Sequence, residues 1–169
     1  MFLVLDSNVW IYAATADEFP VEIYSDILGE RLSFFEGFLS GTYETAITPY
    51  MLLEIKHGLY RSQRVSGTDV DRVLEKLFEL IWTCDSIRAD FPAEAVRETT
   101  LEDVRGGSTV RLLSHLLGIQ KKDVPIFLLA YEYRYERPHI LTDDSDFAAL
   151  SPAEFDLPAI SLEDVNLTW

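Results

Sequence analysis

Two short apolar runs, each followed by an aspartate, do most to limit how this chain can fold. Residues 2–5 lead into Asp6, and residues 139–142 lead into Asp143 and Asp144. A short buried run that ends in a carboxylate is typical of a parallel strand carrying an acid to the carboxyl-terminal edge of a sheet. Because open α/β sheets bind their ligands at that edge, Asp6 and Asp144 are predicted to meet in one site.

Strand and helix signals alternate along the chain, which favours an α/β fold with a mostly parallel central sheet flanked by helices. The length of 169 residues and the 48% hydrophobic content fit a single domain over residues 1–169. Thr48 before Pro49 predicts the start of a helix. Further helices are predicted from Pro20 to Leu39 and from Val70 to Leu80, and further strands at residues 81–83 and 157–160.

The charge of the chain is strongly negative, with 14 basic and 29 acidic residues and a formal net charge of −15. Phosphate affinity comes mostly from Lys and Arg, so the overall field does not favour nucleic acid. Any nucleic-acid role must rest on a local basic strip, on bound cations, or on both. The composition resembles that of proteins from salt-loving cells, where a Debye length of ~3 Å screens self-repulsion. An ordinary acidic cytosolic protein is an equal alternative.

Cysteine and hydropathy exclude several other classes. Cys84 is the single cysteine, which excludes an intramolecular disulfide and a cysteine-rich zinc site. His57, His115 and His139 lack the spacing of metal ligands. No cationic leader precedes the first apolar run, and no apolar stretch approaches the ~20 residues that span a bilayer. We therefore expect a soluble, cytoplasmic protein with no membrane partner.

Two further acids, Glu54 and Asp123, lie near the starts of predicted helices that face the same sheet edge. Each also fits an ordinary structural role on its own. Glu54, beside the buried stripe of its helix, would point to solvent. Asp123, two residues before Pro125, would cap a helix, which contributes about 1 kcal/mol. The four acids Asp6, Glu54, Asp123 and Asp144 indicate a function together, more than any does alone.

Asp143, Asp144 and Asp146 crowd the turn after the second apolar run. At ~5 Å and an effective dielectric constant near 20, each pair of carboxylates costs about 3 kcal/mol. Such a cluster is normally dispersed unless a cation or a proton occupies it. This turn is the strongest local indication of a metal site.

These motifs resemble those of the PIN-domain nucleases, a family that includes the VapC-type toxins of prokaryotic toxin–antitoxin pairs. Residues 4–9 are similar to the first acidic motif, and Glu54 with its neighbours to the second. Asp123, with Ala130 seven positions on, resembles the third motif. Residues 142–147 resemble the last, in which Asp144 is the principal acid.

The resemblance spans residues 2–147, with one departure. The stretch from Asp85 to Gly118 is longer than in compact toxins, which bears on the toxin role more than on the nuclease fold.

The resemblance implies a PIN-like fold and a metal-dependent endoribonuclease that hydrolyses RNA phosphodiester bonds. It would be either a toxin with an antitoxin partner or an RNA-processing enzyme. Carboxylates are hard ligands, so the expected cofactor is Mg²⁺ or Mn²⁺. The catalytic acids would be Asp6, Glu54, Asp123 and Asp144, and the metal ligands Asp6, Asp123, Asp144 and Asp146. The side chains expected to fix these carboxylates are Ser7, Asn8, Thr142 and Ser145.

Two basic groups adjoin these acids and are candidates for binding RNA phosphates. One is Lys56, Arg61 and Arg64 on the helix of Glu54, and the other is Lys121 and Lys122 just before Asp123. The alternative is that they form a solvated face.

Similar nucleases pair through apolar helices, so we also expect a homodimer. Some of the large apolar side chains on two predicted helices should remain exposed for pairing, and the candidates are Phe34, Phe35, Phe38, Leu74, Leu77 and Phe78.

Two other functions compete with the nuclease. A haloacid-dehalogenase-like phosphatase would need a second acid two residues after the first, where this chain has Asn8. A catalytically decayed PIN-like interaction module is the second alternative, although the presence of all four acids argues against it.

Overall fold

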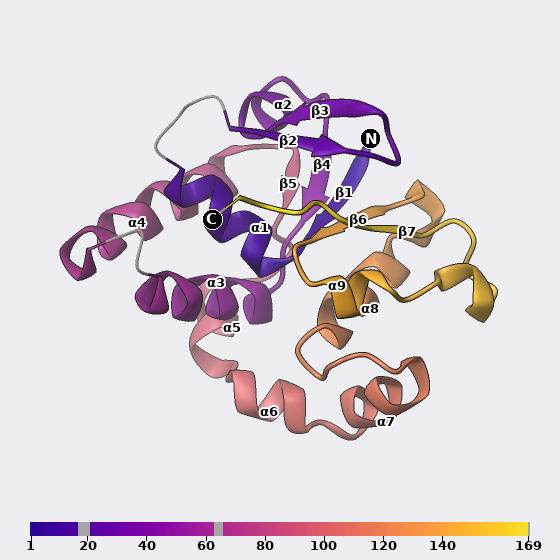
Figure 1. Ribbon diagram of the computed structural model, residues 1–169. Coiled ribbons are helices and arrows are strands. Elements are labelled where there is room, and N and C mark those ends of the chain that lie inside the picture. Colours follow the sequence, from indigo (N-terminus) through magenta and orange to yellow (C-terminus); the bar gives the residue numbers. More distant parts are fainter. Residues whose placement is uncertain (17–20, 63–65, 169) are drawn as a thin grey trace.

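The computed structural model describes residues 1–16, 21–62 and 66–168. Within this part of the chain, five strands form a parallel sheet in the order β5-β4-β1-β6-β7. The α/β fold with a parallel central sheet is therefore confirmed (Figure 1). The strands are β1 (Phe2–Leu5), β4 (Glu44–Ala46), β5 (Ile87–Arg88), β6 (His139–Thr142) and β7 (Ser161–Asp164).

The two apolar runs that end in aspartates form the centre of the sheet. β1 and β6 pair in parallel with Leu5 opposite Leu141, and every residue in both strands is buried. Successive residues of a strand point to opposite faces of the sheet, so burial of all of them means that both faces are covered. Besides the short α2 (Glu36–Leu39), the helices of the described residues are α1 (Ser7–Thr15), α3 (Pro49–Arg61), α4 (Gly67–Thr83), α5 (Ala93–Glu98), α6 (Leu101–Gly106), α7 (Ser108–Leu117), α8 (Val124–Glu132) and α9 (Ser145–Ala148). Helices flank the sheet, while α6 and α7 lie away from it against other helices (Figure 1).

The helix predicted from Pro20 to Leu39 is wrong. Strands β2 (Glu22–Ser25) and β3 (Glu30–Ser33) form an antiparallel hairpin there, and only the short helix α2 (Glu36–Leu39) follows. Burial alternates along β2, with Ile23 inside and Tyr24 exposed, which is the period of a strand. Gly29 turns the chain between the strands at a φ of 68°, a conformation that glycine adopts without strain. Pro20 itself lies outside the described residues.

Two of the predicted strands are also wrong. Residues 81–83 are the last turn of α4, because Ile81 continues the buried helical stripe that includes Leu74 and Leu77. The final strand begins at Ser161, after residues 157–160, because Pro158 has no N–H to donate to a ladder. The helix start at Thr48 is confirmed, since its hydroxyl accepts a hydrogen bond from the Met51 N–H at 3.3 Å.

The side chains expected to form an exposed pairing surface lie mostly in the core. Phe34, Phe38, Leu74 and Leu77 are buried within the chain and cannot form such a surface, whereas Phe35 and Phe78 are half-buried. The four buried side chains pack into the hydrophobic core of the same chain. Among the described helices, none combines the length and the apolarity needed to cross a bilayer.

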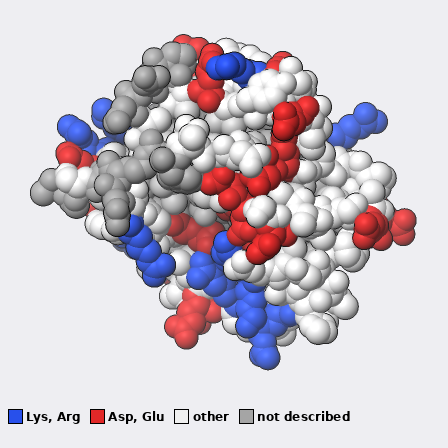
Figure 2. All heavy atoms as spheres, in the orientation of Figure 1, with Lys and Arg blue, Asp and Glu red and all other residues white. Residues whose placement is uncertain are grey.

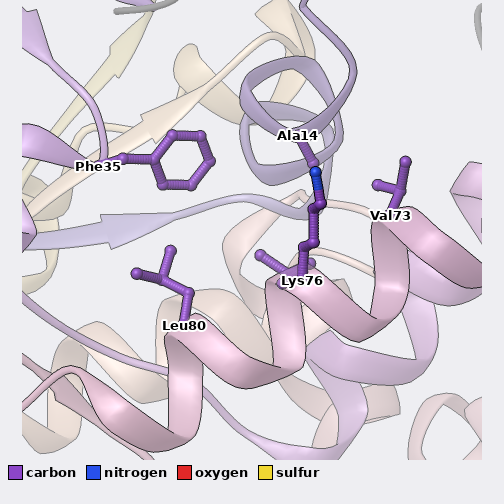
Figure 3. Close-up of a pocket in the computed structure, with 6 residues that line it drawn as sticks. Ala14, Phe35, Val73, Lys76 and Leu80 are labelled. Atoms are coloured by element: carbon purple, nitrogen blue, oxygen red, sulfur yellow. The ribbon is translucent and has the colours of Figure 1, made fainter.

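An apolar cavity of about 350 Å³ lies between α1, α4 and the residue before α2 (Figure 3). Lys76 extends from α4 toward Ala14, and the Phe35 ring lies across the space from α4. Its lining contains none of the four candidate acids, so it is separate from the site described next. The lining residues are Ala14, Phe35, Val73, Lys76, Leu77 and Leu80.

Candidate active site

Asp6 follows β1 directly and is held from both sides. Its Oδ1 accepts a hydrogen bond from the Ser7 N–H at 2.6 Å and another from the Ser7 hydroxyl at 3.2 Å. Its Oδ2 accepts one from the Thr142 hydroxyl at 2.6 Å, across the β1–β6 pair. Burial raises the pKa of the Asp6 carboxyl, and the hydrogen bonds from Thr142 and Ser7 oppose this effect. The carboxylate is thus fixed in place, but its charge is costly.

Asp144 lies two residues after the end of β6, near the same edge of the sheet. Its Oδ1 accepts hydrogen bonds from the Asp146 and Phe147 N–H groups, and so caps α9. Its Oδ2 accepts one from Lys122 Nζ at 2.6 Å. Burial pushes the pKa of Asp144 up, but Lys122 and the two N–H groups outweigh burial and leave the pKa below its usual value. Asp144 is therefore ionised and already has a cationic partner.

Asp123 precedes α8 and is 1% exposed. Its side chain makes no capping hydrogen bond, so the alternative role of this residue as a helix cap is wrong. Its Oδ2 is buried and has no hydrogen-bond partner among the described residues, and Lys122 Nζ lies 3.9 Å from Oδ1. Burial raises the pKa of Asp123 to about 7 against the effect of Lys122, and the charges of Asp6 and Asp144 add to the increase. Asp123 thus carries a buried acceptor that nothing described in the chain satisfies.

Glu54 lies on α3 and is buried rather than pointing to solvent. Its Oε1 accepts hydrogen bonds from the Tyr50 hydroxyl at 2.9 Å and from Arg105 Nη2 at 2.5 Å. Burial raises the pKa of Glu54, Arg105 and Tyr50 lower it, and the charge of Asp6 raises it. The influence of Asp6 places Glu54 at the margin of the same acidic group.

Lys122 lies within this acidic group. Its ammonium contacts Asp144 and Asp123, and the Asp6 charge also raises its pKa, although burial opposes that increase. As the side chains are placed, the described part of the chain contains no group of three or more His, Cys, Asp or Glu residues arranged to hold a metal ion. Acidic and basic side chains adjoin on the face shown in Figure 2. The arrangement is therefore a carboxylate cluster bridged by a lysine.

The crowded aspartates of the last turn point in different directions. Asp143 Oδ1 accepts a hydrogen bond from the Leu167 N–H at 2.6 Å, and Asp146 is exposed. Their separation relieves the repulsion inferred from the sequence, so the crowding no longer indicates a metal site by itself. Of the side chains expected to fix the acids, Ser7 and Thr142 contact Asp6. Ser145 is exposed in the first turn of α9, and Asn8 lines a cavity beside Glu54.

The basic residues proposed from the sequence lie at different places. Arg61 lines the same cavity as Glu54, whereas Lys56 lines another cavity together with Tyr60 and Asp71. Lys121 lines an open cavity along α7, and Lys122 lies among the acids. Arg64 is outside the described residues.

Tyr50 and Arg105 join the site without having been predicted from the sequence. Tyr50 precedes Glu54 by four residues on one helix, and that spacing was a usable signal. Arg105 comes from α6, 51 residues from Glu54, and only tertiary folding brings the two together. Its guanidinium also donates to the Tyr50 hydroxyl at 2.9 Å. The long stretch from Asp85 to Gly118 thus supplies a partner for a candidate acid.

Comparison with known proteins gives only distant likenesses. No protein-family model matches the chain, and a search of curated protein sequences finds no match. Among solved structures, the fold is similar to a chain in the crystal structure of VapBC2 from Rickettsia felis bound to a DNA fragment from their promoter. That similarity covers 96% of this chain and 98% of the other, with 18% sequence identity and a TM-score of 0.48. At that distance, inferences about activity must rest on the residues of this chain.

Proposed function

We propose that the chain is a metal-dependent endoribonuclease whose site consists of Asp6, Glu54, Asp123 and Asp144. The observation that carries this proposal is Asp123, which is buried, uncapped and left with an unpartnered oxygen beside two other acids. A buried carboxylate without a partner destabilises a fold, so it is most readily explained by a ligand that completes it. A decayed interaction module gives no reason to keep such a group.

The residues fit a divalent cation in their chemistry. Carboxylate oxygens suit Mg²⁺ or Mn²⁺. Asp123 Oδ2 makes no hydrogen bond with any described residue, so it would be available to bind the ion. The holding residues would be Asp6, Asp123 and Asp144, with Asp146 as an outer member of the set. When bound, the ion would supply an activated water and neutralise the charge of the leaving oxygen. Asp144 would have to exchange its bond to Lys122 for this ion.

The remaining groups would position the reaction. Thr142 and Ser7 keep the Asp6 carboxylate oriented, which limits reorganisation during the reaction. Glu54 would orient the attacking water or accept its proton, and the rise in its pKa caused by burial makes the carboxylate a stronger base. Lys122, once released from Asp144, would meet a substrate phosphate.

RNA is the proposed substrate because basic side chains adjoin the acids in an otherwise acidic protein. Lys122 contacts two acids and Arg105 contacts a third. A phosphatase of the haloacid-dehalogenase type is less favoured, because Asn8 lines a separate cavity beside Glu54 where that class would need its second acid.

The proposal is tested by hydrolysis of single-stranded RNA with Mg²⁺, Mn²⁺ or EDTA. Asp123→Asn and Asp144→Asn should each lower the rate by about 10²-fold or more, because each removes charge from the cation site. Asp85→Asn, an exposed acid in a turn, is the matched control and should retain full activity. Equal activity of wild type in EDTA and in Mn²⁺ would refute metal dependence.

A toxin role is a narrower form of the same proposal and rests on the motif resemblance. Induced expression of wild type should arrest growth, while Asp144→Asn should not. A neighbouring reading frame with a DNA-binding start and an amphipathic tail should encode the antitoxin and restore growth. Normal growth during expression of an active enzyme would favour RNA processing.

A further inference from the structure

The cavity that Glu54, Asn8 and Arg61 line lies beside the acidic cluster, between α1, α3 and α6. Its volume is about 180 Å³, below the ~300–1,000 Å³ typical of pockets for drug-sized ligands. Ile11, Gly58 and Leu101 form its apolar part, and a Cβ at Gly58 would collide with the Ile11 side chain. The space therefore suits a unit as small as one sugar with its phosphate.

The wall of this cavity carries two arginines and one acid, Glu54, whose charge is paired with Arg105. Arg61 and Arg105 both line it, together with His57, whereas the chain as a whole has a net charge of −15. Arg105 uses Nε and Nη2 for Tyr50 and Glu54, and its Nη1 makes no hydrogen bond within the described residues. Arg61 is exposed and forms no ion pair with a described residue. Two residues that line one small space thus have guanidinium donors left for a ligand, and a phosphate accepts such donors.

Asn8 is a further lining residue and carries a hydrogen-bond acceptor. The amide oxygen of Asn8 is buried and has no hydrogen-bond partner among the described residues. A phosphate diester has no proton to give it, but a ribose 2′-hydroxyl has one. Ser7, the adjacent lining residue, hydrogen-bonds to Asp6 and so connects this cavity to the acidic cluster.

We propose that this cavity is a subsite for one ribose-phosphate unit of single-stranded RNA next to the cleaved bond. Arg61 and Arg105 bind the phosphate, and the Asn8 amide accepts a hydrogen bond from the 2′-hydroxyl. The inference rests on the proposed nuclease function and extends it, because it makes this subsite the place where RNA is distinguished from DNA.

The test measures binding without cleavage, by fluorescence anisotropy of labelled RNA and DNA octanucleotides of one sequence in EDTA and in Ca²⁺. Arg61→Ala should weaken binding of both by about fivefold, and reduce the salt slope by about 0.7. Asn8→Ala should weaken RNA binding by about threefold to tenfold and leave DNA binding unchanged. Arg31→Ala, which removes an exposed arginine on the β2–β3 hairpin, is the matched control and should bind as wild type does.

Three results would overturn the subsite. These are no binding of either octanucleotide by wild type, equal behaviour of Arg61→Ala and Arg31→Ala, or equal losses for RNA and DNA in Asn8→Ala. Thermal melts of each variant must match wild type, and Asn8→Ser replaces Asn8→Ala if the alanine variant is unfolded. Failure of the nuclease proposal would give a different result. The octanucleotides would bind in the expected pattern, but no metal ion would support hydrolysis of RNA.

Discussion

At the scale of single residues, the buried carboxylates of the acidic cluster lower the stability of the folded state. Asp123 has a buried charge with no hydrogen bond to one oxygen, and its pKa is raised to about 7. The folded state therefore binds the Asp123 proton more tightly than the unfolded state, whose carboxyl titrates near its ordinary value of 3.8. Between these two values, the unfolded state loses its proton first, and the free energy of unfolding falls as the pH rises.

Asp123→Asn has no carboxyl proton to lose, so its free energy of unfolding should not fall in this way as the pH rises. The variant should be more stable than wild type at pH 7.5, by about 2–4 kcal/mol, and the gain should disappear below about pH 4. Urea unfolding from pH 4 to pH 8 measures the difference. A variant that is destabilised at neutral pH would show that Asp123 has a partner in solution.

Lys122 competes with any cation for Asp144, because its ammonium lies 2.6 Å from Asp144 Oδ2. Lys122→Gln should therefore bind Mn²⁺ more tightly by about tenfold, the equivalent of about 1.4 kcal/mol. Titration calorimetry with Mn²⁺ measures the affinity, and Lys121→Gln is the matched control from the preceding position. Weaker binding in Lys122→Gln would mean that the lysine supports the metal site.

At the scale of elements, a buried acid helps to hold α6 and another helps to hold the β2–β3 hairpin against the rest of the fold. For α6 this acid is Glu54, which pairs with Arg105. For the hairpin it is Glu163 on β7, which accepts hydrogen bonds from the Ser25 hydroxyl at 2.6 Å and from the Asp26 N–H. His139 Nε2 lies 2.9 Å from the same carboxylate.

Arg105→Ala should destabilise the fold by about 1–3 kcal/mol at pH 7, because it leaves the buried Glu54 carboxylate without a cation. Because Arg105 is partly exposed and solvent screens its charge, we expect a destabilisation near the lower end of this range. Glu54→Gln should reverse most of the loss in the double variant. Urea unfolding of the four proteins tests this cycle, and additive losses would mean that the two residues are uncoupled.

Glu163→Gln should loosen the hairpin. Burial raises the pKa of Glu163, but hydrogen bonds from Ser25, His139 and Asp26 outweigh it and leave the pKa lowered. The lowered pKa stabilises the fold above the unfolded value near 4.5, and this contribution is lost as the pH falls through the folded value. Hydrogen exchange of β2 and β3 amides should be faster in Glu163→Gln at pH 7, and unchanged exchange would contradict the role.

How much the sequence predicts also differs between elements. β1 and β6 were predictable because a short apolar run that ends in an acid fits few structures besides a buried parallel strand. The hairpin was not, because large apolar residues such as Phe34 and Phe35 outweighed the alternation along residues 21–25. The pairing of Arg105 with Glu54 had no local signal, since the two residues lie far apart in the sequence and share no motif. The unpartnered oxygen of Asp123 depends on packing that periodicity does not encode.

At the scale of the whole molecule, the net charge of −15 should make stability and association depend on salt. Self-repulsion opposes both folding and self-association at low ionic strength, so melting temperature should rise as KCl is added. A protein adapted to high salt should keep gaining stability up to molar KCl, whereas an ordinary acidic protein should level off near ~0.2 M. Thermal melts across this range separate the two.

Light scattering in the same buffers tests the predicted homodimer. The dimer should tighten as salt rises, through surfaces other than the buried phenylalanines. A monomer at every KCl concentration, at micromolar protein, would exclude it.

The order of strands has a consequence for when the acidic cluster can assemble during synthesis. Asp6 and the Thr142 that orients it lie 136 residues apart, and β1 occupies the centre of the sheet between β4 and β6. A growing chain displays Asp6 early, but the neighbour that buries it leaves the ribosome much later. The nascent polypeptide therefore cannot assemble the acidic cluster for most of its translation, and the proposed activity can begin only after β6 has emerged.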